Sequence, residues 1–261
     1  MSYPVFIFFL LYSHALNAQD TFQLAPPLLK YRSVFFTDRA KLEIKFNQPG
    51  ATVHYTSNDG EPDLTSPVYN SPVVIRNKKQ TIRAKAFAPG LLVSETVTVT
   101  FVKEGIRINS ISGSTPDPRY PGKGLPGLFD NEGGLPDMVS RTWLGYQADT
   151  VGIEIHLGKN RTIHRVLLNL LQQKGSWVWL PAGIRLYGSN PETGSYEPIP
   201  ARRKNEESVP GNGIIIKEVF PGKKLYTDKL KLELITVKKI PAGNPGEGEH
   251  GWLFIDEIKV Y

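Results

Sequence analysis

The sequence predicts an all-β protein made of two β-sandwich domains, and three observations lead to this prediction. The chain has 24 glycines and 21 prolines among 261 residues, a share above that of average proteins and typical of turn-rich folds. Apolar and polar residues alternate with period two through much of the chain, which is the pattern of half-buried strands. The length fits two domains, since one domain usually takes roughly 100–200 residues.

The first element in order is an apolar run at residues 4–16, followed by Leu16-Asn17-Ala18. This run is too short to cross a bilayer but has the length of a secretory signal, and the small residue after it suits a cleavage site. We therefore predict a signal peptide at residues 1–18 and a secreted or periplasmic protein. The alternative is a buried first strand. The chain has no cysteine, so a lipidated N-terminal cysteine is excluded, and no other stretch is apolar enough to span a membrane.

The next element is a small β-sandwich, which we assign to residues 30–103. Within it, apolar residues alternate in four runs, at 42–46, 53–55, 82–86 and 97–101. Glycine and proline favour turns, and such turn signals separate the runs: Gln48-Pro49-Gly50, Asn58-Asp59-Gly60, Ser71-Pro72 and Pro89-Gly90. Short alternating strands with regular turns predict a sandwich.

A segment rich in proline and glycine, residues 113–134, then interrupts the alternation. It is either a linker or a long loop wrapped over a second domain. After it the strand patterns return, at 152–157, 163–171, 183–187, 214–219, 229–237 and 252–261. We assign residues 104–261 to a second β-sandwich.

Two stretches of the first domain resemble a known family. They read VHYTSNDGEPDLTSPVYNSPVVI and QTIRAKAFAPGLLVSETVTVTF. Both are similar to the C-terminal-type β-sandwich that follows the catalytic domain of chitobiases and β-hexosaminidases. The resemblance implies a small immunoglobulin-like sandwich that serves as a spacer or docking module.

Four stretches of the second domain resemble the discoidin (coagulation factor V/VIII C-type) domain. They read RYPGKGLPGLFDNEGG, RTWLGYQ, LLQQKGSWVWLP and GWLFIDEI. The version appended to bacterial family 20 hexosaminidases is the most similar one. The resemblance implies a galactose-binding-like jelly-roll β-sandwich of the kind found in family 32 carbohydrate-binding modules, and it predicts that the domain binds a glycan. Asn131 stands where that family often has glycine.

Several function classes are disfavoured. The catalytic barrel of the hexosaminidases needs roughly 250 residues of alternating strands and helices, and this chain has no such pattern. The absence of cysteine excludes disulfides, thiolate metal sites and a cysteine nucleophile. The formal net charge of +6 is too small an excess to predict nucleic acid as a partner. We expect no enzymatic activity.

Aromatic residues are the best candidates for contacts to a sugar, because a sugar presents an apolar C–H face and a rim of hydroxyls. Trp177 and Trp179 flank Val178 and would point to the same side if the segment is extended. Tyrosine and charged or polar groups from other turn-rich stretches complete the predicted site: Tyr146, Arg141, His250 and Glu247. The alternative for each tryptophan is a place in the core, which we favour for Trp143 and Trp252.

The discoidin resemblance also implies a structural calcium ion that ties a loop to the end of the domain. The family's ligand positions fall on Asp130, Thr142 and Glu257, all oxygen donors of the kind calcium prefers. The alternative is that Asp130 caps a turn and Glu257 lies on a solvated strand face.

Together these observations predict an exported, non-catalytic protein that recognises a glycan or glycoconjugate through loops of its second domain. Two alternatives stay open. One is a structural or docking module that binds a protein partner such as a glycoside hydrolase. The other is a catalytically empty remnant of a β-N-acetylhexosaminidase.

Overall fold

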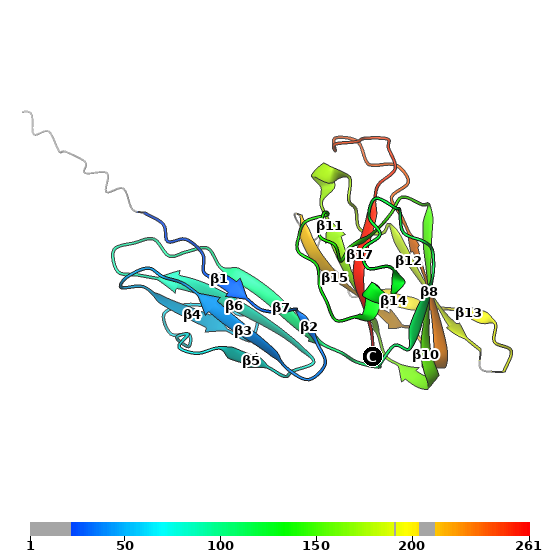
Figure 1. Ribbon diagram of the computed structural model, residues 1–261, viewed down its shortest axis with the longest axis horizontal. Coiled ribbons are helices and arrows are strands. Elements are labelled where there is room, and N and C mark those ends of the chain that lie inside the picture. Colours follow the sequence, from blue (N-terminus) through cyan, green and yellow to red (C-terminus); the bar gives the residue numbers. More distant parts are fainter. Residues whose placement is uncertain (1–21, 191, 204–211) are drawn as a thin grey trace, which may run out of the picture.

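Two β-sandwiches follow one another along the chain in the computed structural model, which describes residues 22–190, 192–203 and 212–261 (Figure 1). The prediction of an all-β protein is confirmed. The predicted signal peptide, residues 1–18, lies outside the described residues. Within the described ranges, no helix has the length and apolar character needed to cross a membrane.

The first sandwich consists of a three-stranded and a four-stranded sheet. The three-stranded sheet has the order β1-β3-β5 and the other has the order β2-β7-β6-β4. Neighbouring strands are antiparallel, except that β2 is parallel to β7. The strands are β1 (Leu28–Lys30), β2 (Phe35–Phe36), β3 (Ala40–Lys45), β4 (Thr52–Thr56), β5 (Val73–Ile75), β6 (Lys79–Phe87) and β7 (Val97–Lys103).

The alternation seen in the sequence forms the core of this sandwich. In β6, Ile82, Ala84 and Ala86 are fully buried, whereas the residues between them are half-buried. Because successive side chains of a strand point to opposite faces, this pattern directs one face of the sheet inward. Leu42 and Phe101 from the facing sheets join the same apolar cluster.

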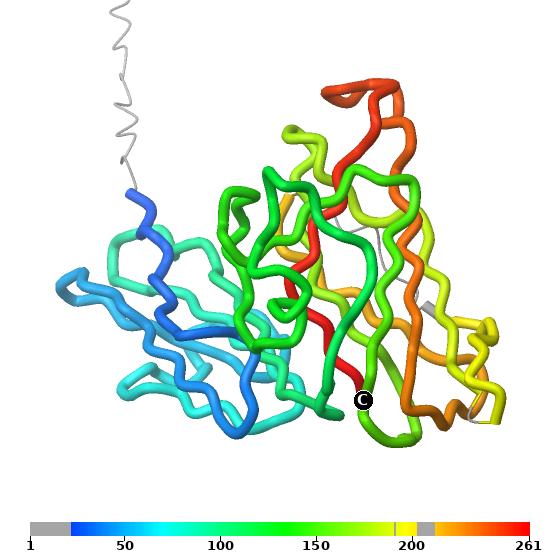
Figure 2. Tube along the Cα trace, turned by 45° about the vertical axis from the view of Figure 1, so that its right-hand side comes forward, coloured from blue at the N-terminus to red at the C-terminus, as the bar shows by residue number. Residues whose placement is uncertain are grey.

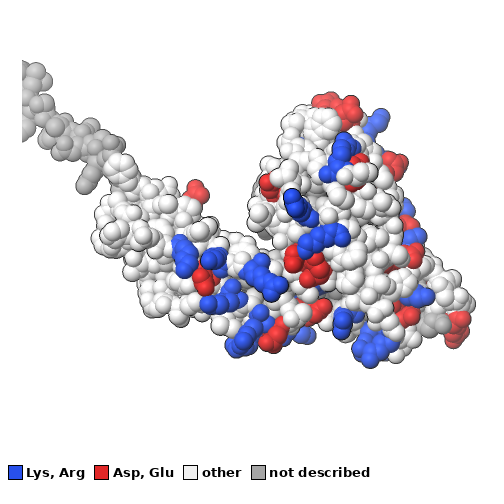
Figure 3. Space-filling view, in the orientation of Figure 1, with Lys and Arg blue, Asp and Glu red and all other residues white. Residues whose placement is uncertain are grey.

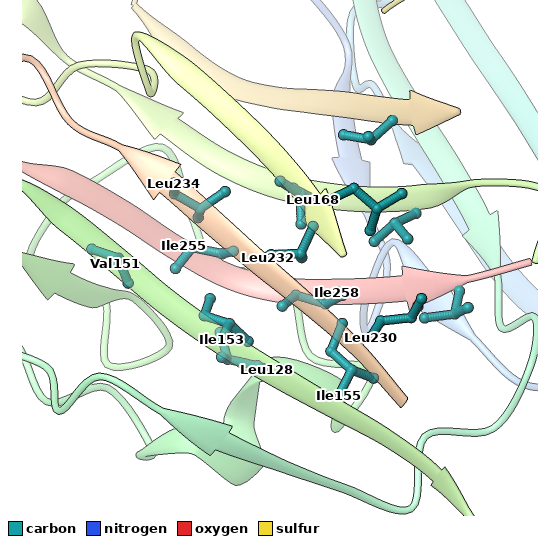
Figure 4. Close-up of a cluster of buried hydrophobic side chains, with 14 of the residues drawn as sticks. Leu128, Val151, Ile153, Ile155, Leu168, Leu230, Leu232, Leu234, Ile255 and Ile258 are labelled. Atoms are coloured by element: carbon teal, nitrogen blue, oxygen red, sulfur yellow. The ribbon is translucent and has the colours of Figure 1, made fainter. Parts of the chain in front are cut away.

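The second sandwich consists of two five-stranded antiparallel sheets, with orders β13-β12-β16-β10-β8 and β14-β15-β11-β17-β9. One large apolar cluster fills the space between them (Figure 4). The strands are β8 (Ser110–Gly113), β9 (Leu144–Tyr146), β10 (Thr150–Ile163), β11 (Val166–Gln172), β12 (Gly183–Ser189), β13 (Tyr196–Ile199), β14 (Ala201–Arg203), β15 (Gly213–Pro221), β16 (Leu225–Ile235) and β17 (Leu253–Val260).

Strand β17 carries a bulge that affects its outer face. Asn169 of β11 pairs with Glu257, and the next residue, Leu170, pairs with Ile255, so Asp256 is the extra residue. Ile255 and Ile258 both belong to the core between the sheets. The bulge therefore leaves two consecutive acidic residues, Asp256 and Glu257, on the outer face.

The proline- and glycine-rich segment covers this outer face, as the wrapped-loop alternative predicts. It contains one short 3-10 helix, η1 (Leu125–Phe129). The Gly134 amide donates to the Asp256 carboxyl, and Trp143 Nε1 donates to the Leu135 carbonyl at 2.9 Å. Figure 2 shows this green segment between the first sandwich and the red final strand.

Candidate functional site

The predicted tryptophan pair lies at one end of the second sandwich, where two connections meet. One connection, residues 173–182, joins β11 to β12, and the other, residues 236–252, joins β16 to β17. Their backbones bond to each other: Trp252 N donates to the Trp177 carbonyl at 2.8 Å, and Trp179 N donates to the Trp252 carbonyl at 2.9 Å. We call this surface the loop end; both ribbon and tube views place it at the top of the second sandwich (Figures 1 and 2).

Trp177 has an unusual backbone. It ends the 3-10 helix η2 (Lys174–Ser176) in the left-handed conformation, with φ 65° and ψ 16°. Among the described residues, only Asp59 and Asn131 share a positive φ without being glycine. Asp and Asn adopt this region fairly readily, whereas a bulky side chain there is strained. The segment is therefore not extended, which was the condition for Trp177 and Trp179 to point to the same side.

The left-handed turn leaves the Trp177 side chain at the surface. The residue is 36% exposed, and one side of its ring lies against Gly246, where a Cβ atom would collide with the indole. Gly246 has φ 77°, so a glycine serves both the turn and the close approach. The loop end thus presents a partly exposed indole supported from below by backbone.

Trp179 packs closer to the protein than Trp177. Lys174 Nζ lies 5.0 Å from the centre of its ring, and a Cβ atom at Gly251 would lie 3.1 Å from its Cδ1. Its indole Nε1 is buried and bonds to no described residue. Val178, between the two tryptophans, is fully buried.

Polar groups beside the tryptophans come from the second connection. Glu247 is exposed, and its Oε2 accepts from Gly243 N at 3.0 Å. His250 is half-buried; its Nδ1 donates to the Gly251 carbonyl at 2.8 Å, and its Nε2 lies 3.3 Å from Asp149 Oδ1. Bonds to Lys238 and His250 hold the pKa of Asp149 below its usual range. His250 and Glu247 thus lie in the same loop as the glycine beneath Trp177.

Two of the predicted sugar contacts lie elsewhere. Tyr146 is 2% exposed and belongs to the core between the sheets, and burial raises the pKa of its hydroxyl. The prediction for Tyr146 is wrong, because β9 directs its ring inward. Arg141 is exposed but lines a different hollow of about 350 Å³ together with Arg119 and Trp143.

Trp143 and Trp252 are buried, as favoured from the sequence. They are 1% and 8% exposed and form a second apolar cluster with Phe254 on the outer face of β17. The Tyr120 ring meets Trp252 edge-on with 5.1 Å between centroids, and Arg119 lies 4.7 Å above it. These rings fasten the loop over the sheet.

The three predicted calcium ligands bond to other groups. Asp130 Oδ2 lies 2.9 Å from Lys123 Nζ, and Thr142 bonds to Ser140 at 3.2 Å. Glu257 Oε1 accepts from Lys259 Nζ at 2.8 Å. In the part of the chain that the structure describes, no three His, Cys, Asp or Glu side chains are grouped so as to hold a metal ion.

A buried ammonium lies beside Glu257, one of the predicted ligands. Lys259 is 3% exposed, and its Nζ donates to Asn131 Oδ1 at 2.7 Å as well as to Glu257. Asn131 has φ 64°, the conformation that glycine would supply at this position. Because Lys259 already supplies the positive charge, the residues do not fit a calcium ion here, and the ion stays a prediction without support from the geometry.

Burial dominates the titration of the two bulge acids. It raises the pKa of Asp256 to about 7, against bonds from Asn169 and Gly134. It raises the pKa of Glu257 to about 8, against the charge of Lys259. The bulge therefore holds acidic groups in surroundings that favour their neutral forms.

Asp149, Lys238 and Asn169 were not among the predicted site residues. Asp149 and Lys238 form an exposed ion pair that joins the two ends of neighbouring strands. Asn169 lies inside an apolar run and is 1% exposed. Its only signal in the sequence is that a polar residue interrupts the apolar run VLLNLLQ. A buried amide needs specific hydrogen-bond partners, so such an interruption points to a special role.

Comparisons with known proteins give one family and a group of solved structures. A protein-family model described as "Fn3 associated" matches residues 42–101, which lie in the first sandwich. No curated protein sequence matches the chain. The resemblance of the first domain to the chitobiase-type sandwich stays a prediction.

Several of the similar solved structures are family 32 carbohydrate-binding modules. One is the module of AlyQ in complex with 4,5-unsaturated mannuronic acid, at 14% identity and a TM-score of 0.35, covering 59% of this chain and 95% of that one. Another is the module of NanJ from C. perfringens in complex with galactose, at 13% identity and a TM-score of 0.35, covering 58% of this chain and 91% of that one. A third is the module of EndoD from Streptococcus pneumoniae, at 14% identity and a TM-score of 0.39, covering 60% of this chain and 96% of that one.

Proposed function

We propose that this is an exported, non-catalytic carbohydrate-binding protein that recognises a glycan at the loop end of its second domain. The observation that carries the proposal is Trp177, a bulky residue held in the left-handed conformation with its indole partly exposed. Residues held in sparsely populated backbone conformations persist only where the surroundings fix them, and they cluster at binding sites.

The chemistry of the loop end suits a sugar. An indole offers a large, stiff apolar face for the C–H side of a pyranose ring. Glu247 and His250 lie in the loop that supports that indole and offer an acceptor and an imidazole for hydroxyl groups. A few polar groups around an apolar surface are typical of small-molecule sites.

The remaining parts of the proposal rest on the sequence. Residues 104–261 form the binding domain, and residues 30–103 form a spacer or docking domain. Export rests on the apolar run at 4–16, and the absence of a barrel pattern supports a non-catalytic role.

A glycan array probed with the purified protein tests this function. We expect binding to a defined set of glycans and its loss in Trp177→Gly, since glycine keeps the left-handed backbone while the ring is removed. Tyr226→Ala is the matched control, because Tyr226 is an exposed aromatic residue (56%) on β16 outside the loop end. Equal binding by wild type and Trp177→Gly, or no binding to any glycan, would overturn the proposal.

A docking role for the first sandwich is the second candidate, favoured by one apolar patch. Phe22, Leu92 and Val93 are 74%, 53% and 41% exposed and adjacent, since Leu92 N donates to the Phe22 carbonyl at 3.0 Å. Exposed apolar patches of this kind mark interaction surfaces. This role would be supported by a pull-down in which a bound protein is lost with Leu92→Asp but retained with Trp177→Gly.

A further inference from the structure

The two sandwiches meet along a packed seam. Phe35 and Val102 of the first sandwich form one apolar cluster with Leu167 of the second. Ser33 Oγ donates to the Asn131 carbonyl at 2.7 Å, and Tyr261 Oη donates to the Lys103 carbonyl at 2.5 Å. These contacts hold the two domains against each other at the base of the seam.

Above this base lies a hollow of about 600 Å³, which we call the seam groove. The first sandwich lines it with residues of β1, the segment after β1, β6 and β7, and the second lines it with residues of β11, β15 and the covering loop. Figure 3 shows a notch between the two bodies, with both Lys or Arg and Asp or Glu side chains at its floor and wall. Ligand sites occur preferentially at domain interfaces.

Apolar and hydroxyl groups share the walls of the seam groove. Tyr31, Leu135 and Ile214 line it and are 40%, 67% and 37% exposed. Thr98 and Thr100 line it from β7. Such walls offer flat apolar contact and hydrogen bonds together, which suits a ligand with alternating C–H faces and hydroxyls.

The groove is also cationic. Lys30, Arg32 and Lys79 line it. Lys79 lies 3.7 Å from Glu218, whereas neither Lys30 nor Arg32 forms an ion pair with any carboxylate in the described residues. The pKa of Glu132 is lowered mainly by its bond to Lys123 and to a smaller degree by Arg32. Two positive charges are thus left for an anionic ligand.

Asn169 supplies an independent observation. It lines the groove from β11 and is 1% exposed. Its Nδ2 donates to Asp256 Oδ1 at 2.7 Å, while its Oδ1 is buried and has no hydrogen-bond partner among the described residues. A buried acceptor without a partner costs about 1–3 kcal/mol, and such groups in folded proteins call for an explanation. A ligand hydroxyl at this wall would satisfy it.

We propose that the seam groove binds a segment of an anionic polysaccharide. Lys30 and Arg32 receive its carboxylate or sulfate groups, Tyr31 receives the apolar face of a sugar ring, and Asn169 Oδ1 accepts a hydroxyl hydrogen bond. The site lies apart from Trp177 and does not rest on the function proposed for the loop end.

Titration calorimetry of the purified protein against a panel of polysaccharides tests the proposal. The probes are polygalacturonate, alginate and chondroitin sulfate, with carboxyl-reduced polygalacturonate as the neutral counterpart and poly-glutamate as an acidic peptide. We expect at least one anionic polysaccharide to bind, the neutral polymer to bind at least 10-fold more weakly, and poly-glutamate to bind weakly because it has no ring faces or hydroxyls.

Variants place the binding within the seam. Lys30→Ala/Arg32→Ala should weaken binding at least 10-fold, whereas Lys223→Ala/Lys224→Ala, which removes the same charge from an exposed turn between β15 and β16, should leave it within 2-fold. Tyr226→Ala, which removes an exposed aromatic ring on β16 outside both sites, should also leave it unchanged. Tyr31→Ala should weaken binding without any change in charge.

Four results would each overturn the proposal. The first is an equal loss of binding in Lys30→Ala/Arg32→Ala and in Lys223→Ala/Lys224→Ala, and the second is equal binding of the neutral polymer. The third is tight binding of poly-glutamate that depends on Lys30 and Arg32. The fourth is no binding of any anionic polysaccharide. The third result would assign the groove to an acidic peptide instead.

Discussion

The outer face of β17 and the loop end both contain tryptophans in glycine-rich surroundings, yet they use them differently. Under the covering loop, Trp143 and Trp252 are 1% and 8% exposed and fasten a segment that has little secondary structure. At the loop end, Trp177 is 36% exposed and has a strained backbone. The presence of a covering loop, and not the local sequence, therefore decides whether a tryptophan here is buried or exposed.

Trp143→Ala should separate the two regions by the largest effect. We expect a loss of about 3–5 kcal/mol in the free energy of unfolding, because a large buried ring leaves a cavity when it is removed. Urea denaturation followed by far-UV circular dichroism measures it. Trp177→Gly serves as control, and a loss as large in that variant would remove the distinction between the two regions.

The buried pair on the same outer face gives the next largest effect. Lys259→Met should cost about 1–3 kcal/mol, since it leaves the buried Glu257 carboxyl without its hydrogen-bond donor. Glu257→Leu/Lys259→Met should recover most of the loss, because replacing both members removes the unpaired group. Urea denaturation of both variants at pH 7 checks this; a double variant as unstable as the single one contradicts the pairing.

The bulge also predicts a pH dependence. The folded-state pKa of Asp256 is raised to about 7, above the roughly 3.9 of an unfolded Asp. The folded protein therefore binds more protons between these values, and stability from this group is fully present below about pH 4 and lost as the pH rises through 7. In Asp256→Asn, the urea midpoint of unfolding should change less with pH between pH 4 and 8 than it does in the wild type. An unchanged slope would show that Asp256 does not titrate in this way.

At the loop end the expected stability effects are smaller. Trp177→Gly should be more stable than Trp177→Ala by about 1 kcal/mol, because only glycine adopts the left-handed conformation without strain. Thermal unfolding of the two variants in parallel measures the difference. Equal stability would show that the turn relaxes once the indole is gone.

Removal of divalent cations should have the smallest effect. Since the Lys259 ammonium lies between Glu257 and Asn131, we expect the thermal midpoint to stay within about 1 °C when a chelator replaces calcium. A large drop, at roughly 4 °C per kcal/mol for a domain of this size, would restore the predicted ion.

The strands were predictable because alternation is local, and the sites were not because they depend on distant segments. Ile153 and Ile155 reveal their strand by period alone. Tyr146, by contrast, lies in a strand of only three residues, which is too short for the alternation to show whether its side chain points to the core or to solvent. The bulge at Asp256 depends on pairing with Asn169, and the seam groove on two domains meeting, so neither has a signal in one stretch of sequence.

The position of β17 in its sheet has a consequence for synthesis of the chain. The strand lies between β11 and β9, and its residue Leu253 pairs with Tyr146, which the ribosome makes more than 100 residues earlier. The first sandwich has all its strands once residue 103 is made, and domains generally fold as units during synthesis. The second sandwich and the seam must wait for residues 253–260, so the first sandwich reaches its native form while β9 and β11 still lack the strand that joins them.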